Sequence, residues 1–209
     1  MEGAWKILDK SEAQAILEKS KRRVFVGSMM DIFEKPQPMI DGKGNVLKNP
    51  EGTLRNTGEL RNKLFEKISN GDYPNLIFLF LTKRPSNINK YIPDDWKVNP
   101  PDNVMFGTSV CDQNFAKTYI NQLVKVKGKR FLSVEPQLDW ITLMPWLKNQ
   151  SIHWVINGGE SGSGKRPFNT DWARRLRAEC KVTGTAFFFK QIDKVQTIPP
   201  DLEIHEYYM

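Results

Sequence analysis

The sequence has few of the residues from which metal centres and disulfide frameworks are built. Its 209 residues include two cysteines, Cys111 and Cys180, and two histidines, His153 and His205. Two distant cysteines do not indicate a disulfide framework, so we expect reduced thiols in a cytoplasmic protein. Cys111 follows a predicted strand, where an inert thiol is more usual than a reactive one. Neither histidine has a second ligand at zinc-finger or helical spacing, and no metal site is predicted.

The sequence also lacks a long apolar run. No stretch approaches the roughly 18 apolar residues that a membrane-spanning helix needs, so no membrane association is expected. The first ten residues are polar and of mixed charge, which is unlike a signal peptide. The length and a hydrophobic content of 39% are sufficient for a buried core, and we expect a single domain over residues 1–209.

Positive charge exceeds negative charge, with a formal net charge of +7 and an isoelectric point near 9.3. This balance favours acidic partners, either a nucleic acid or an anionic small molecule. The basic runs at 19–23 and 125–130 each precede a predicted strand. Such runs are also typical of solvated helix ends and turns, so charge alone does not choose a partner.

Apolar strand patterns alternate with helical patterns along the chain. The predicted strands are 24–26, 76–81, 104–106, 130–134, 153–156 and 186–189. The predicted helices are 11–19, 60–68, 86–91, 114–124 and 171–182, with Ser11 and Gly184 as candidate caps. This order predicts a parallel sheet with right-handed crossovers. Either an open doubly wound sheet or a partial or complete TIM-like βα barrel of about six to eight strands satisfies the pattern.

Two segments fall outside the alternation. Residues 35–58 are rich in proline and glycine and form a predicted inserted loop, with a small hairpin near 42–45. Residues 199–209 are expected to form a peripheral tail.

Polar residues follow each of the six predicted strands. In a parallel sheet these positions share one edge, where the ligand sites of barrels and open sheets lie. The sequence therefore predicts a pocket there, although helix caps and turns use the same residue types. The candidate residues on this rim are Ser28, Asp31, Lys83, Arg84, Asp112, Gln113, Ser133, Glu135, Asn157, Glu160, Lys190 and Gln191.

Three of these residues are candidates for a catalytic role. Glu135 and Glu160 are suited to acid–base chemistry or to anchoring a substrate, and Lys190 faces them from another strand. Lys83 and Arg84, with Lys190, would hold an anionic group. Opposite charges in one cleft form structural ion pairs as readily as catalytic ones.

A glycine-rich loop follows the fifth predicted strand. Gly158, Gly159 and Gly162 free backbone N–H groups to turn toward a ligand, and Arg166 lies nearby. The stretch from Gly159 fits the first seven positions of a nucleotide-binding P-loop. The eighth position should be Ser or Thr but is Arg166, followed by Pro167, so a nucleotide triphosphatase is not predicted.

Six ordered motifs carry a resemblance to a known family. They are RVFVGSMMDIF (23–33), LTKRP (81–85), GTSVCDQ (107–113), RFLSVEP (130–136), GGESG (158–162) followed by Arg166-Pro167, and FFFKQ (187–191). Together they span most of the chain. The sequence resembles an uncharacterised family of phage and prophage proteins, whose layout is similar to that of the radical S-adenosylmethionine enzymes.

The resemblance implies a partial βα barrel and makes S-adenosylmethionine a candidate cofactor. It does not carry over the iron–sulfur cluster, since residues 1–22 contain no cysteine where the family has a cysteine-rich segment. Cys111 also stands where the family usually has an acidic residue, and Val134 where it usually has a cysteine. No cluster is therefore expected from this chain alone.

Three functions remain open from the sequence. The first is a ligand pocket at the carboxyl ends of the strands, with or without catalysis. The second is binding or modification of nucleic acid. The third is a non-catalytic subunit of a split complex whose partner chain carries the missing cysteines.

Overall fold

The computed structural model describes residues 2–27 and 30–208, and it contains one six-stranded sheet. All neighbouring strands are parallel and follow the order of the sequence. The strands are β1 (Arg22–Val26), β2 (Leu76–Thr82), β3 (Val104–Ser109), β4 (Lys129–Val134), β5 (Trp154–Gly158) and β6 (Ala186–Gln191). The structure thus confirms each of the six predicted strands, with small shifts at their ends.

Helices connect the strands. The α-helices are α1 (Glu2–Leu17), α2 (Thr57–Ser69), α3 (Ile88–Tyr91), α4 (Gln113–Phe115), α5 (Asn121–Leu123), α6 (Met144–Leu147) and α7 (Thr170–Thr183). Short 3-10 turns occur at η1 (Pro85–Asn87), η2 (Asp95–Lys97) and η4 (Pro200–Leu202), and a π-helical turn, η3 (Ala116–Ile120), joins α4 to α5. None of the described helices is long and apolar enough to cross a membrane.

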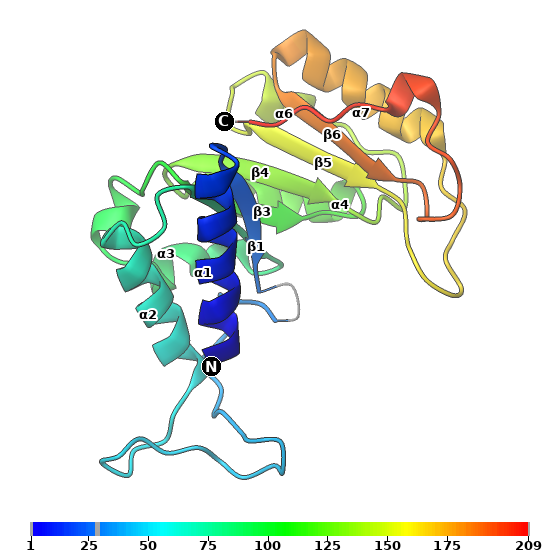
Figure 1. The fold of residues 1–209 in the computed structure, drawn as a ribbon. Coiled ribbons are helices and arrows are strands. Elements are labelled where there is room, and N and C mark those ends of the chain that lie inside the picture. The colour runs from blue at the N-terminus through cyan, green and yellow to red at the C-terminus, as the bar shows by residue number, and fades with distance from the viewer. Residues whose placement is uncertain (1, 28–29, 209) are drawn as a thin grey trace.

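The strand order distinguishes between the two predicted architectures. In a doubly wound sheet the order of the strands reverses at a switch point. Here every strand pairs with the next one along the chain. The sheet curves between its edges β1 and β6, which are not paired with each other (Figure 1). The fold is therefore an α/β half-barrel, a partial TIM-like barrel, and not a doubly wound sheet.

Side chains alternate between the two faces of the strands. On the convex face, Phe78, Phe80 and Phe106 are fully buried in the large core beneath the helices. On the concave face, Leu79, Met105, Phe131, Trp154 and Ile156 belong to a second, smaller cluster. The concave face therefore has its own apolar floor.

Gly107 allows this floor to pack closely. A Cβ atom at Gly107 would lie 2.4 Å from the ring of Phe131, far inside normal contact distance. Phe131 fills the space across the centre of the concave face, beside Phe25 and Trp154. A glycine in the middle of a strand is thus explained by close packing of an aromatic ring.

The first helix is longer than the sequence predicts. It begins at Glu2, and the candidate cap Ser11 lies inside it, with its hydroxyl donating to the carbonyl of Ile7 at 2.8 Å. A serine within a helix can satisfy its hydroxyl in this way, so the capping pattern was misleading here. Gly184, in contrast, does end α7 in the left-handed conformation with φ of 71°, as predicted.

The inserted segment 35–58 forms an arm that projects from the body (Figure 1). Antiparallel bridges join Ile40 to Val46 and Lys48 to Leu54. The side chain of Asp41 caps the turn by accepting hydrogen bonds from the backbone of Lys43 and Asn45, which agrees with the predicted hairpin. The Asn45 side chain also donates to Asp41. This hydrogen bond is the largest cause of a lowered pKa of Asp41, and the backbone hydrogen bonds lower it further.

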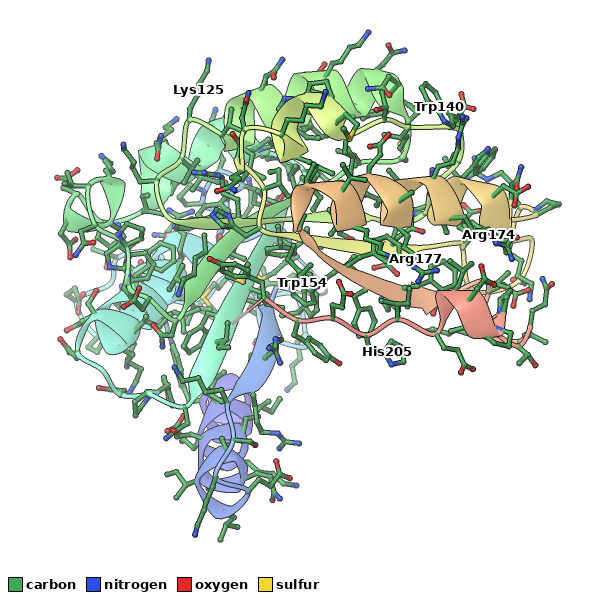
Figure 2. The ribbon with its side chains drawn as sticks, turned by 90° about the horizontal axis from the view of Figure 1, so that it is seen from above. Lys125, Trp140, Trp154, Arg174, Arg177 and His205 are labelled. Carbon is green, nitrogen blue, oxygen red and sulfur yellow. The ribbon has the colours of Figure 1, made fainter. Side chains whose placement is uncertain are left out.

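Much of the tail predicted at 199–209 lies along the open edge of β6. Phe189 donates its backbone N–H to Ile204 at 2.9 Å, and Glu206 donates to Phe187 at 3.1 Å. The preceding turn, η4, lies beside the end of α7 that carries Arg174 (Figure 2). The Arg174 guanidinium lies 2.8 Å from an Asp201 carboxylate oxygen. The C-terminal segment, residues 203–208, thus covers one of the two free edges of the sheet.

Candidate functional site

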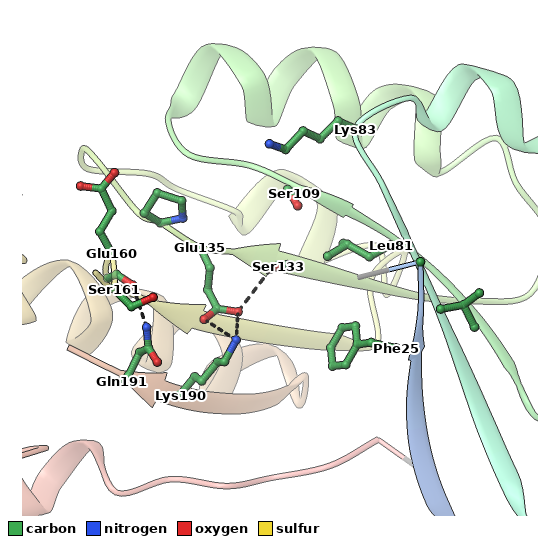
Figure 3. A pocket seen from close by; sticks show the side chains of 14 residues that line it. Phe25, Leu81, Lys83, Ser109, Ser133, Glu135, Glu160, Ser161, Lys190 and Gln191 are labelled. Atoms are coloured by element: carbon green, nitrogen blue, oxygen red, sulfur yellow. Dashed lines mark hydrogen bonds and ion pairs between the residues drawn. The ribbon is translucent and has the colours of Figure 1, made fainter. Parts of the chain in front are cut away.

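A cleft of about 630 Å³ lies at the carboxyl ends of the strands, above the apolar floor of the concave face. Every strand except β3 contributes to it two or more residues from its end or the following loop. Figure 3 shows acidic, basic and hydroxyl side chains around this space. The residues that line the cleft are Phe25, Val26, Gly27, Leu81, Lys83, Ser109, Ser133, Glu135, Pro136, Gly159, Glu160, Ser161, Lys190 and Gln191.

An ion pair joins two of the three predicted catalytic residues inside the cleft. Lys190 Nζ lies 3.3 Å from Oε1 and 3.4 Å from Oε2 of Glu135. The buried hydroxyl of Ser133 lies 3.4 Å from Oε2 of the same carboxylate. Glu135 is only 16% exposed and Lys190 is 51% exposed, so the carboxylate is the more shielded partner (Figure 3).

Lys83 stands apart from this pair, on the opposite side of the cleft (Figure 3). It lines both the main cleft and an adjoining space of about 280 Å³, and Ser109 does so too. Within residues 2–27 and 30–208 its ammonium group has no ion-pair partner. A lysine of this kind leaves a net positive charge at the mouth of the cleft.

Asp31 and Arg84 line the adjoining space and are bound to one another. An Asp31 carboxylate oxygen accepts a hydrogen bond from Arg84 at 3.1 Å, and the same carboxylate accepts from the hydroxyl of Thr82 at 2.7 Å. The backbone N–H of Lys83 also donates to Asp31, at 3.1 Å. Asp31 therefore fastens the loop after β1 to the end of β2, and it holds Arg84 at the adjoining space.

The glycine-rich loop is held by a two-pronged ion pair between Glu160 and Arg166. Arg166 donates to Glu160 through Nε at 2.8 Å, through its backbone N–H at 2.9 Å and through a second guanidinium nitrogen. The hydrogen bonds from the Arg166 side chain, followed by that from its backbone, lower the pKa of Glu160 to about 2. Glu160 lines the cleft, yet it is already paired and fully ionised near neutral pH.

Two glycines of this loop are closely packed, and Gly159 leaves no room for a side chain. A Cβ atom at Gly158 would lie 3.1 Å from Oε1 of Glu135, and one at Gly159 would lie 2.2 Å from the carbonyl oxygen of Ile192. Gln191 donates its side-chain amide to the carbonyl of Gly159 at 3.3 Å. Gly162 has a φ of 106° and open space around it, so its glycine serves the turn alone.

Three of the predicted rim residues line neither the cleft nor the adjoining space. Asp112 caps α4 by accepting from Asn114 at 2.8 Å. The side-chain amide of Gln113 donates to the carbonyl of Thr142 and accepts from its backbone N–H. Asn157 is fully buried on the other face of the sheet.

These three side chains have structural partners. At strand exits, Asp, Gln and Asn cap helices and bind loop backbone as readily as they bind ligands. Asn157 donates to Gln137 at 2.8 Å. Ser28 is outside the described residues.

Several residues of the cleft were not singled out from the sequence. Phe25 and Leu81 line it with apolar surface, and Phe25 is 46% exposed there. Ser161 adds a hydroxyl group, beside that of Ser109, which the sequence already placed on the rim after the third predicted strand. Side chains alternate between the two faces of a strand. Counting back from the ends of β1 and β2 by this rule would have placed Phe25 and Leu81 on the face that lines the cleft.

The described part of the chain contains no group of three or more His, Cys, Asp or Glu residues arranged to hold a metal ion. Cys180 is buried in α7 and Cys111 lies beside Asp112. Burial, with a smaller effect of Asp112, raises the pKa of Cys111. The residues present do not fit an iron–sulfur cluster, which requires several closely spaced thiolates.

The fold and the site define a class, namely parallel α/β half-barrels with a charged cleft at the carboxyl ends of the strands. Residues 56–199 match the model of a family described as "Protein of unknown function (DUF5131)". Because this match covers more than half of the chain, the chain belongs to that family. Comparisons with curated proteins and with solved structures gave no match.

Proposed function

We propose that this chain binds an anionic small molecule, of the size and type of a nucleotide, in the cleft at the carboxyl ends of the strands. The observation that carries the proposal is the position of Lys83, a cation without a carboxylate partner among the described residues, at the mouth of a cleft of about 630 Å³. That volume lies within the range of about 300–1,000 Å³ usual for small-molecule sites.

The composition of the lining supports this ligand class. Phe25 and Leu81 offer apolar surface for a base or another planar group, and Ser109 and Ser133 offer hydroxyl groups for its polar edge. Lys83 supplies the charge for a phosphate or carboxylate. A mostly apolar lining with a few converging polar groups is typical of small-molecule sites.

If the protein is an enzyme, Glu135 and Lys190 are the groups placed to move a proton. They are in contact with one another, and both line the cleft, so a ligand group that displaced Lys190 would meet the Glu135 carboxylate. Glu160 is less suited to general acid–base work, since its pKa of about 2 leaves no proton to donate near neutral pH. We assign to Glu160 a structural role, namely holding the conformation of the glycine-rich loop through Arg166.

S-adenosylmethionine is one of the ligands to be tested. The sequence motifs resemble those of a phage protein family whose layout is similar to that of the radical S-adenosylmethionine enzymes. The residues of this chain do not fit the iron–sulfur cluster of such enzymes, so no radical step is assigned to it. A partner chain that carries cysteines stays a prediction.

The test is calorimetric titration of the purified protein with mononucleotides, dinucleotides and S-adenosylmethionine. The Lys83→Met variant should bind at least about tenfold more weakly, as expected for loss of a charged hydrogen bond. Lys148→Met is the matched control, because Lys148 is exposed and lies outside the cleft lining. Absence of binding across the panel, or equal loss in both variants, would contradict the proposal.

Nucleic acid is the second candidate, favoured by the net charge of +7. At the cleft, however, Arg84, Arg166 and Lys190 are each paired with a carboxylate, which reduces the attraction for a phosphate backbone. Binding of an oligonucleotide that weakens steeply with added salt would favour this candidate.

A further inference from the structure

A further cavity, of about 240 Å³, lies deeper on the concave face than the cleft and the space that adjoins it. It shares Phe25, Glu135 and Lys190 with the main cleft, so the two spaces adjoin at the Glu135–Lys190 ion pair. Its walls include the aromatic rings of Trp154 and Tyr207. Tyr207 comes from the C-terminal segment, so that segment completes this cavity.

Arg23 lines this cavity from β1. Its guanidinium carbon lies 4.1 Å from the ring centre of Tyr207 and 6.0 Å from that of Trp154. Across the described residues it has no carboxylate partner, and its Nε atom is buried without a hydrogen-bond acceptor. Burial lowers the pKa of Arg23, but an arginine remains charged at any ordinary pH.

The other charges around the cavity do not compensate Arg23. Glu135 and Lys190 also line it, and they neutralise each other. Tyr207 contributes a hydroxyl group, and the remaining lining is apolar or aromatic, from residues such as Phe188 and Ile156. The cavity therefore has an excess of one positive charge, and the Nε donor of the same guanidinium is buried without an acceptor.

We infer that the Arg23 cavity binds the carboxylate or phosphate of a ligand whose planar body lies against the rings of Trp154 and Tyr207. The inference rests on the proposed function, because it extends that ligand site down the concave face. Arginine presents a planar fork of donors that suits both oxyanions, and its other face can stay stacked on an aromatic ring.

The family match begins at residue 56 and ends at residue 199. Arg23, Phe25 and Tyr207 thus lie outside the matched segment, whereas Trp154 and Phe188 lie inside it. The Arg23 and Tyr207 sides of this cavity are therefore built from parts of the chain outside the matched segment.

The same contacts could serve only to fasten the C-terminal segment to β1, and the experiment separates the two roles. Benzoate and phenyl phosphate are the anionic probes and benzyl alcohol is the neutral one, each titrated into the full chain by calorimetry. The variants are Arg23→Met and, as the matched control, Arg22→Met, since Arg22 is the exposed neighbour on the same strand. Melting temperatures of all variants are recorded alongside.

We expect at least one anionic probe to bind, benzyl alcohol to bind at least about tenfold more weakly, and Arg23→Met to remove that preference. Benzoate and phenyl phosphate then distinguish a carboxylate site from a phosphate site. Equal binding of benzyl alcohol, or unchanged anion binding in Arg23→Met, would overturn the inference. A purely fastening role would lower the melting temperature of Arg23→Met without any preference for anions in the wild type.

Two further outcomes separate this inference from the proposed function. Nucleotide binding that depends on Lys83, with neither aromatic anion bound, would leave the main cleft in place and reject the Arg23 cavity. If Arg23→Met fails to fold, Arg23→Lys and Arg23→Gln are compared instead, because the first keeps the positive charge and the second removes it. The lysine variant should bind the anion more tightly than the glutamine variant, and equal binding would overturn the inference.

Discussion

Glu135 and Lys190 are in contact at the carboxyl end of the half-barrel, with Nζ 3.3 Å from Oε1, although 55 residues separate them in the sequence. They come from the ends of β4 and β6, the two strands that flank β5 in the sheet. Both the main cleft and the deeper cavity touch this pair. It is the point where any ligand that spans the two spaces would meet ionised side chains.

Replacing Glu135 by Gln should alter ligand binding or activity while leaving the fold stable. Lys190 is half exposed, and partly exposed ion pairs contribute about 0–1 kcal/mol to the free energy of unfolding. We therefore expect a small change in denaturant midpoint and a much larger change in ligand affinity or turnover. Glu66→Gln, on the exposed surface of α2, is the matched control. Unchanged ligand binding in Glu135→Gln would show that the pair is only structural.

The Glu160–Arg166 pair should persist into acid. The folded pKa of Glu160 is about 2, whereas an unpaired glutamate titrates near about 4.3. A depressed folded pKa means that the stability from this pair is fully present above the ordinary value and is lost as pH falls from there through the folded value. Carbon-13 NMR of the Glu160 carboxyl should show this low pKa, and Arg166→Met should return it toward the ordinary value. Titration near the ordinary value in the wild type would contradict the pairing.

Gly107→Ala should destabilise the protein by overpacking the concave floor. The added methyl group would lie 2.4 Å from the Phe131 ring, and overpacking of a core typically costs about 1–3 kcal/mol. Gly42→Ala is the control, because a Cβ atom there meets no atom within 4 Å. Urea denaturation measures both free energies of unfolding. Equal values for the two variants would mean that Phe131 moves aside without cost.

Cys111 should react with iodoacetamide no faster than a free thiol. Burial, with Asp112 as the second cause, raises its pKa, so less of the reactive thiolate is present near neutral pH. Cys180 is fully buried and should react only on unfolding. Comparing the wild type with Cys111→Ser by mass spectrometry assigns the label. Alkylation of Cys111 faster than that of a free cysteine would contradict the expected inert thiol.

The framework was predictable from the sequence because it depends on local patterns. Runs such as 76–81 are apolar throughout, as strands buried on both faces are, and helices follow them in a regular order. The choice between a half-barrel and a doubly wound sheet was not predictable, since periodicity does not encode the order of strands. Only the pairing of each strand with its sequence neighbour decides it.

The candidate site was predictable in part for the same reason. Lys83, Glu135 and Lys190 end strands, and their positions at one sheet edge follow from parallel pairing alone. The partners of Glu160 and Asp112 were not predictable, because each depends on how one loop folds back. The Arg23 cavity was missed because one of its walls comes from a C-terminal segment that shows no strand pattern.

The central claim is that a small anionic ligand binds in the cleft at the carboxyl ends of the strands. NMR chemical-shift mapping with the tightest ligand of the nucleotide panel tests it most directly. We predict that the largest backbone shifts fall on Lys83, Ser109, Gly159 and Lys190, which line the cleft from four different strands or their loops. Shifts concentrated on the projecting arm at 35–58 or on the outer face of α7, with none in the cleft, would contradict it.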